Sequence, residues 1–187
     1  MKHRNSTRAL LSVIFGITLI VSADAFAFDG VRKGIVMGAG LGFSPWVRVQ
    51  SADNWVGTTE SGPGVNFFMG YAWNDRNMIV YEATGTYYTS TYFNKTDIFE
   101  GLSGVRWYYY MGRRDRPFFF SLGLGAFRFS SAYDELDSNG FGYSVGGGWE
   151  FMKQVQIGLF YSGGSSDATF ATLNHNVLSV LVTVVAY

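Results

Sequence analysis

The chain has 187 residues, of which 48% are hydrophobic, 18% aromatic and 15% charged. This length fits a single domain, and this composition excludes a disordered chain. The absence of cysteine excludes a disulfide framework and a thiolate metal site.

Residues 1–27 have the three parts of a bacterial signal peptide. Three basic residues precede an apolar run from Ala9 to Val21, and Ala25-Phe26-Ala27 is a small-x-small cleavage site. The apolar run is shorter than the roughly 20 residues of a membrane-anchoring helix. We therefore predict an exported protein whose mature domain is residues 28–187. That domain has 11 basic and 13 acidic residues, a net charge of −2, which gives no reason to expect nucleic-acid binding.

Large apolar residues alternate with small or polar ones along most of the mature chain, which predicts β-strands rather than helices. No later stretch is long and apolar enough for a membrane helix, whereas most strands have about the 9 to 11 residues that a tilted membrane strand needs. The eight predicted strands are 34–47, 62–72, 78–90, 97–110, 118–130, 140–151, 155–162 and 175–187.

The predicted connectors alternate in length. Outer-membrane barrels have short periplasmic turns and longer outer loops, so this alternation predicts that both termini are periplasmic. The long connectors are 48–61, 91–96, 131–139 and 163–174, and the short ones are 73–77, 111–117 and 152–154.

The strand 140–151 shows the alternation most clearly. Phe141, Tyr143, Val145, Trp149 and Phe151 fall on one face, and glycine, serine and glutamate fall on the other. Large residues on one face and small ones on the other are typical of a lipid side and a lumen side. The sequence therefore predicts an all-β fold, an eight-stranded antiparallel transmembrane β-barrel with up-and-down topology.

Two segments resemble the small outer-membrane β-barrel family that includes the OmpA transmembrane domain, OmpX and, more distantly, OmpW. They are the glycine-rich strand Gly34-Ile35-Val36-Met37-Gly38-Ala39-Gly40 and the final strand ending Val184-Val185-Ala186-Tyr187. The resemblance spans the mature chain, and it implies an outer-membrane protein surrounded by lipids and lipopolysaccharide. It also implies that Tyr187, where the family usually has Phe, is the signal for the barrel-assembly machinery. We expect a monomer with a structural or surface-interaction role through its outer loops.

Four charged residues, Glu82, Glu100, Arg106 and Glu150, fall on the lumen side of their strands. A buried charge is tolerated only when it is paired. If residue 90 pairs with residue 98, Glu82 lies opposite Arg106, and Glu150 lies at the same depth. We predict that Glu82 and Arg106 form an ion pair within about 6 Å. Because eight strands enclose little more than their own side chains, we interpret this network as a plug, with a gate as the alternative.

A second hypothesis is a narrow channel or a site for small hydrophobic molecules, as the resemblance to OmpW implies. Four phenylalanines fall at the predicted lumen-facing positions of their strands, and four aliphatic residues of the last strand join them if Tyr187 faces outward. These residues are Phe68, Phe119, Phe127 and Phe160, and Leu178, Val180, Val182 and Val184.

A third hypothesis is a lipid-modifying enzyme similar to the lipid A deacylases, which use a histidine, a serine and a carboxylate on the outer face. The only histidine after processing, His175, lacks the His-x-Ser spacing of those enzymes. Ser165, Ser166 and Asp167 lie in the preceding predicted loop. We predict that the protein is not an enzyme, and we interpret His175 as a polar residue at the mouth of a strand.

The predicted outer loops are rich in acidic residues. Asp134, Glu135 and Asp137 could ligate calcium, but they lack the spacing and the glycine of a calcium-binding loop. We therefore predict no metal and no cofactor.

Overall fold

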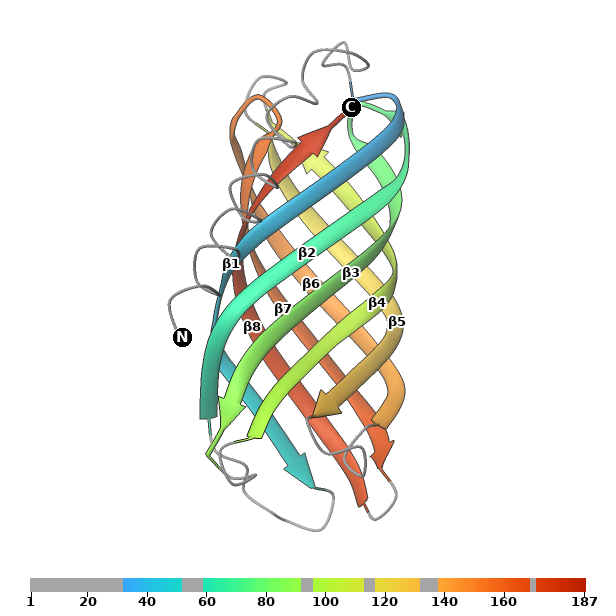
Figure 1. Ribbon diagram of the computed structural model, residues 1–187. Coiled ribbons are helices and arrows are strands. Elements are labelled where there is room, and N and C mark those ends of the chain that lie inside the picture. Colours follow the sequence, from blue (N-terminus) through green and yellow to red (C-terminus); the bar gives the residue numbers. More distant parts are fainter. Residues whose placement is uncertain (1–31, 52–58, 92–95, 113–116, 132–137, 169–170) are drawn as a thin grey trace, which may run out of the picture.

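The computed structural model describes residues 32–51, 59–91, 96–112, 117–131, 138–168 and 171–187. Within these ranges the chain forms eight antiparallel strands, each paired with its neighbour in sequence, and β1 pairs with β8 to close the barrel (Figure 1). The predicted fold class is confirmed. The strands are β1 Gly34–Ser51, β2 Thr59–Asn74, β3 Asn77–Ser90, β4 Thr96–Met111, β5 Phe118–Ser131, β6 Ser138–Met152, β7 Val155–Ala168 and β8 Ala171–Ala186.

Two of the turns at the end of the barrel that carries the C-terminus are tight. In the β2–β3 turn the Asn74 side chain accepts hydrogen bonds from the backbone N–H groups of Arg76 and Asn77, both at 2.9 Å. The β6–β7 turn contains Gln154 with φ of 67°, and its N–H donates to the Glu150 carboxylate at 3.2 Å. We call this end, at the top of Figure 1, the periplasmic end, because short turns face the periplasm in barrels of this kind.

The strands extend further at the opposite, outer end than the sequence predicted. β7 and β8 together take up most of the predicted loop 163–174, so that only residues 169 and 170 separate them. The prediction of a long loop at residues 163–174 is therefore wrong. Its outward-facing residues, among them Ser165, Asp167 and Asn174, are polar, so the apolar alternation that marks a strand disappears although the backbone pairing continues.

The outward face of the barrel carries an apolar belt. Large hydrophobic side chains on all eight strands are 36% to 64% exposed. The belt ends toward the outer end of the barrel, where the outward-facing residues become polar. We call this polar band the outer collar, and it includes Arg48, Gln50, Arg128, Asn139, Ser165, Asp167, Asn174 and Asn176. Apolar surface of this extent is not stable in water, so the belt is the surface that faces lipid.

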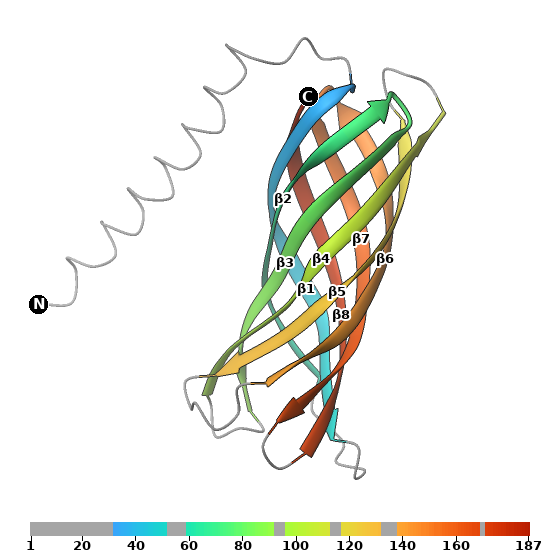
Figure 2. The same cartoon turned by 90° about the vertical axis from the view of Figure 1, so that its right-hand side faces the viewer.

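The strands are strongly tilted around the barrel axis (Figures 1 and 2). Because the sheet closes on itself, every strand pairs with a neighbour on both sides and no sheet edge meets lipid, which a lipid environment requires. No helix among the residues described here is long and apolar enough to cross a membrane.

The direction of the side chains in β8 is opposite to the one that the apolar-ligand hypothesis needed. Tyr187, Val185, Thr183 and Leu181 face the lumen, where each is at most 5% exposed. Leu178, Val180, Val182 and Val184 alternate with them and face lipid, so they do not join the four inward phenylalanines. Both faces of β8 are apolar, and the choice between them came from its neighbours: inward Leu181 lies opposite inward Gly42 of β1 and Gly158 of β7.

Candidate functional site

Two apolar clusters of buried side chains lie in the lumen, one in each half of the barrel. The periplasmic cluster includes Phe68, Tyr108, Tyr110, Phe119 and Phe160. Its rings lie 5.6 to 6.3 Å apart between centroids. The outer cluster is built around Tyr88, Ile98, Leu102, Phe127, Phe129, Leu173 and Val177. Glycines leave the space that these large side chains occupy: a Cβ on Gly38 would lie 2.3 Å from the Phe68 ring.

An ion pair lies in the lumen at the third and fourth strands. Arg106 Nη1 donates to Glu82 Oε1 at 2.9 Å, and both side chains are about 3% exposed. The Tyr108 hydroxyl donates to the other Glu82 oxygen at 2.6 Å, and Arg106 Nη2 donates to Ser144 at 2.6 Å. The ion pair and its hydrogen bonds therefore connect β3, β4 and β6. The distance of 2.9 Å between the charged groups is well below the predicted limit of about 6 Å.

The strand register behind this pair differs from the predicted one. Glu82 lies opposite Gly104, and Arg106 lies opposite Val80, so β3 and β4 are shifted by two residues. The ion pair forms across this diagonal because the arginine side chain is long enough to reach it. Pairing begins at Ser90 and Thr96 rather than at residues 90 and 98.

Glu150 does not join Glu82 and Arg106, so the prediction of a shared depth is wrong. Its carboxylate pairs with Arg32 at the periplasmic mouth and accepts a hydrogen bond from the Tyr187 hydroxyl at 2.7 Å. The Arg32 guanidinium also lies 3.6 Å from the centre of the Tyr110 ring. Arg32 was not among the predicted lumen residues, because it precedes the first strand and the alternation of side chains along a strand does not apply to it.

Glu100 lies in the outer half of the lumen with His175. His175 Nδ1 is 3.1 Å from Glu100 Oε2, and His175 Nε2 is 2.7 Å from Ser166 Oγ. Ser166 Oγ is also 2.7 Å from Ser138 Oγ. The hydrogen-bonded chain thus joins β4, β8, β7 and β6, and it was missed because residues 163–174 were predicted to be a loop. In the longer strands of the structure, both Ser166 and His175 occupy lumen-facing positions.

Ser166, His175 and Glu100 are hydrogen-bonded in the same order as the serine, histidine and carboxylate of a serine-hydrolase triad. In such a triad the histidine removes the serine proton while a substrate carbonyl contacts the serine oxygen. Here all three side chains are about 1% exposed, and the His175 ring stacks on Phe127 with centroids 4.6 Å apart. The chain of hydrogen bonds gives Ser166 and both His175 ring nitrogens partners inside the lumen, whereas Glu100 Oε1 is buried without a partner among the described residues.

The described residues contain no group of three or more histidine and acidic side chains that could hold a metal ion. Asp134, Glu135 and Asp137, the candidate calcium ligands, lie outside the described residues. The predicted signal peptide, residues 1–27, also lies outside them.

A closed eight-stranded barrel with an apolar outward belt and a packed lumen is an outer-membrane β-barrel of the smallest kind. Solved structures share this fold. Neisserial surface protein A is 18% identical, with a TM-score of 0.56 over 81% of this chain and 96% of that one. Ail, the attachment invasion locus protein of Yersinia pestis, is 12% identical, with a TM-score of 0.51 over 81% of this chain and 99% of that one. No protein-family model and no curated protein matches the chain.

Proposed function

We propose that this protein is a non-enzymatic outer-membrane barrel with a lumen closed by its own side chains, which presents a rigid polar surface outside the membrane. The closed lumen is supported by one observation above others. The hollow beside Glu82 and Arg106 has a volume of only about 10 Å³, the lower limit for one water molecule. We therefore expect a hydrated ion or a small solute to pass this level of the barrel only if the ion pair moves.

The other layers support the same proposal. Arg32 and Glu150 pair at the periplasmic mouth beside the aromatic cluster, and the chain of Glu100, His175, Ser166 and Ser138 joins four strands in the outer half. Side chains therefore cross the lumen at three depths.

Single-channel conductance of the refolded mature protein, residues 28–187, in planar bilayers tests the closed lumen. We expect the wild type to be silent. Glu82→Gln keeps the side-chain shape but releases Arg106 from its charge partner, and Asp97→Asn makes the same change on an outward-facing side chain as a matched control. Conductance from Glu82→Gln alone would identify the ion pair as a plug that can be gated, and steady conductance from the wild type would contradict the closed lumen.

The outer collar supports the surface role, because its strands project beyond the apolar belt and keep their pairing. The chain has no cysteine, so a single introduced cysteine is the only thiol of this protein that can be labelled, and its labelling reports whether that one position is accessible. On intact cells, a membrane-impermeant maleimide should label Asn174→Cys in the collar and leave Leu159→Cys in the belt unlabelled. If Asn174→Cys reacts only after the cells are lysed, the collar does not face the exterior and the proposed surface role is wrong.

A further inference from the structure

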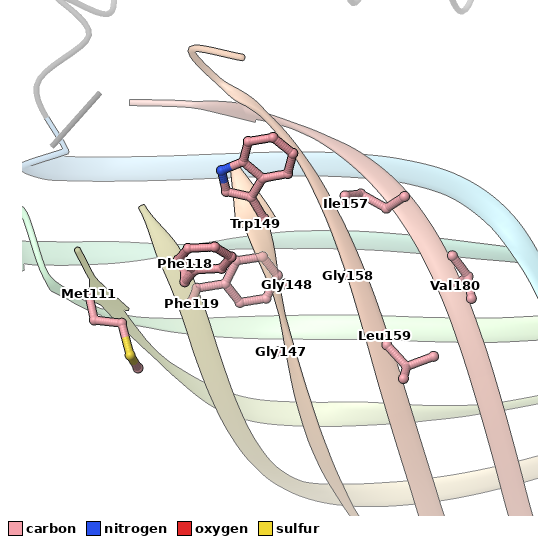
Figure 3. A pocket seen from close by; sticks show the side chains of 10 residues that line it. All are labelled: Met111, Phe118, Phe119, Gly147, Gly148, Trp149, Ile157, Gly158, Leu159 and Val180. Carbon is pink, nitrogen blue, oxygen red and sulfur yellow. The ribbon is translucent and has the colours of Figure 1, made fainter. Parts of the chain in front are cut away.

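A hollow of about 470 Å³ lies on the lipid-facing surface near the periplasmic end (Figure 3). We call it the lipid groove. Its walls are formed by Met111, Phe118, Trp149, Ile157, Leu159 and Val180, with Gly147 between them.

One glycine opens the lipid groove. Gly147 faces outward between Val145 and Trp149, which are both large. A Cβ at this position would meet just one atom within 4 Å, the Phe119 carbonyl oxygen at 3.2 Å. Trp149 and Phe118 form a stacked wall, with ring centroids 6.3 Å apart. The groove is therefore a gap in the belt at Gly147, bordered on one side by the stacked rings of Phe118 and Trp149.

A second hollow of about 250 Å³ lies at the periplasmic rim and shares Met111 with the lipid groove. Arg32, Asp75 and Arg76 line it. The Arg32 guanidinium is held by Glu150, whereas Arg76 is exposed. The backbone of Arg76 is fixed, because its carbonyl accepts a hydrogen bond of 2.7 Å from the Tyr110 N–H. An exposed cationic side chain, Arg76, therefore lines the rim hollow, which borders the lipid groove at Met111.

We propose that the lipid groove and the rim hollow together bind one phospholipid of the periplasmic leaflet, with an acyl chain in the groove and the phosphate at Arg76. The groove is continuous with the belt that faces lipid, so an acyl chain is the group that this surface meets. The arginine guanidinium binds phosphate through two parallel hydrogen bonds. Asp75 on the same rim disfavours a head group with excess negative charge, which favours a zwitterionic lipid such as phosphatidylethanolamine.

Native mass spectrometry of the folded protein, released from detergent after addition of phosphatidylethanolamine, tests this proposal. The comparison lipid is diacylglycerol with the same acyl chains, which lacks the phosphate. We expect the wild type to retain one phosphatidylethanolamine molecule and to retain diacylglycerol about tenfold less, as the loss of a charge-assisted phosphate contact implies.

Two variants separate the two parts of the site. Gly147→Val fills the groove and should reduce retention of both lipids, whereas Arg76→Gln should remove the preference for the phosphate-bearing lipid. Ala126→Val adds two methyl groups to the lipid face outside the groove, and Arg128→Gln removes a cation at the outer end, so neither should change retention. Equal retention by the wild type and Gly147→Val, or equal retention of the two lipids by the wild type, would overturn the proposal. Dimers without a lipid adduct would show that a second copy occupies the groove, which would also overturn it.

A fluorescence measurement tests the same site without relying on the folding of Gly147→Val. Phosphatidylethanolamine brominated on its acyl chains should quench the wild type more than brominated diacylglycerol does, and this difference should disappear in Trp149→Phe. The same difference in Trp149→Phe as in the wild type would place the lipid elsewhere and refute the site.

Discussion

Arg106→Met removes the cation from the ion pair in the lumen while it keeps most of the volume of the side chain. The remaining Glu82 carboxylate is about 3% exposed, so it stays buried without a counter-charge. Breaking a buried ion pair by removing one partner costs about 3 to 5 kcal/mol. Glu82 keeps hydrogen bonds from the hydroxyls of Tyr108, at 2.6 Å, and Thr84, at 3.0 Å. We therefore expect a loss at the lower end of this range, about 3 kcal/mol in the free energy of unfolding.

The double variant Glu82→Gln with Arg106→Met removes both charges. Because neither side chain then leaves a buried charge unpaired, we expect it to recover most of the lost stability and to unfold within about 1 kcal/mol of the wild type. Urea-dependent unfolding in lipid vesicles, followed by tryptophan fluorescence, measures all four members of this cycle. A double variant as unstable as Arg106→Met would refute the reasoning, since the loss would then come from packing rather than from an unpaired charge.

Three further predictions concern other parts of the barrel. Gly42→Ala should prevent folding, because a Cβ there would lie 1.9 Å from a backbone oxygen of β8, whereas Gly147→Ala, with its nearest atom at 3.2 Å, should fold; the two are compared by gel mobility with and without heating. Ser166 should remain unlabelled by a fluorophosphonate probe, and labelling of the folded protein at this residue would contradict the non-enzymatic role. The pKa of Asp97, beyond the apolar belt, is lowered because the Thr89 hydroxyl donates to its carboxylate. Thr89→Val should therefore raise that pKa in an NMR titration, and an unchanged pKa would be evidence against this hydrogen bond in solution.

Local patterns in the sequence determined the number of strands and the direction of most side chains. The alternation of large and small residues has a period of two, which any extended segment shows without reference to its partners. It therefore placed Phe141 and Trp149 toward lipid and Gly142 and Gly146 toward the lumen, as the structure does. The lumen parity of Glu82, Glu100, Arg106 and Glu150 followed from the same local rule.

The tertiary structure decided which of these residues meet. Strand register is set by pairing between strands, so the two-residue shift between β3 and β4 could not be read from either strand alone. The face of β8 was ambiguous because Leu and Val occupy both sides, and the glycines of β1 and β7 selected Leu181 for the lumen. Closure of the barrel brought Glu100 to His175 across 75 residues of sequence, and Arg32 to Glu150 across 118. These contacts depend on the positions of several strands at once, which a period-two pattern does not encode.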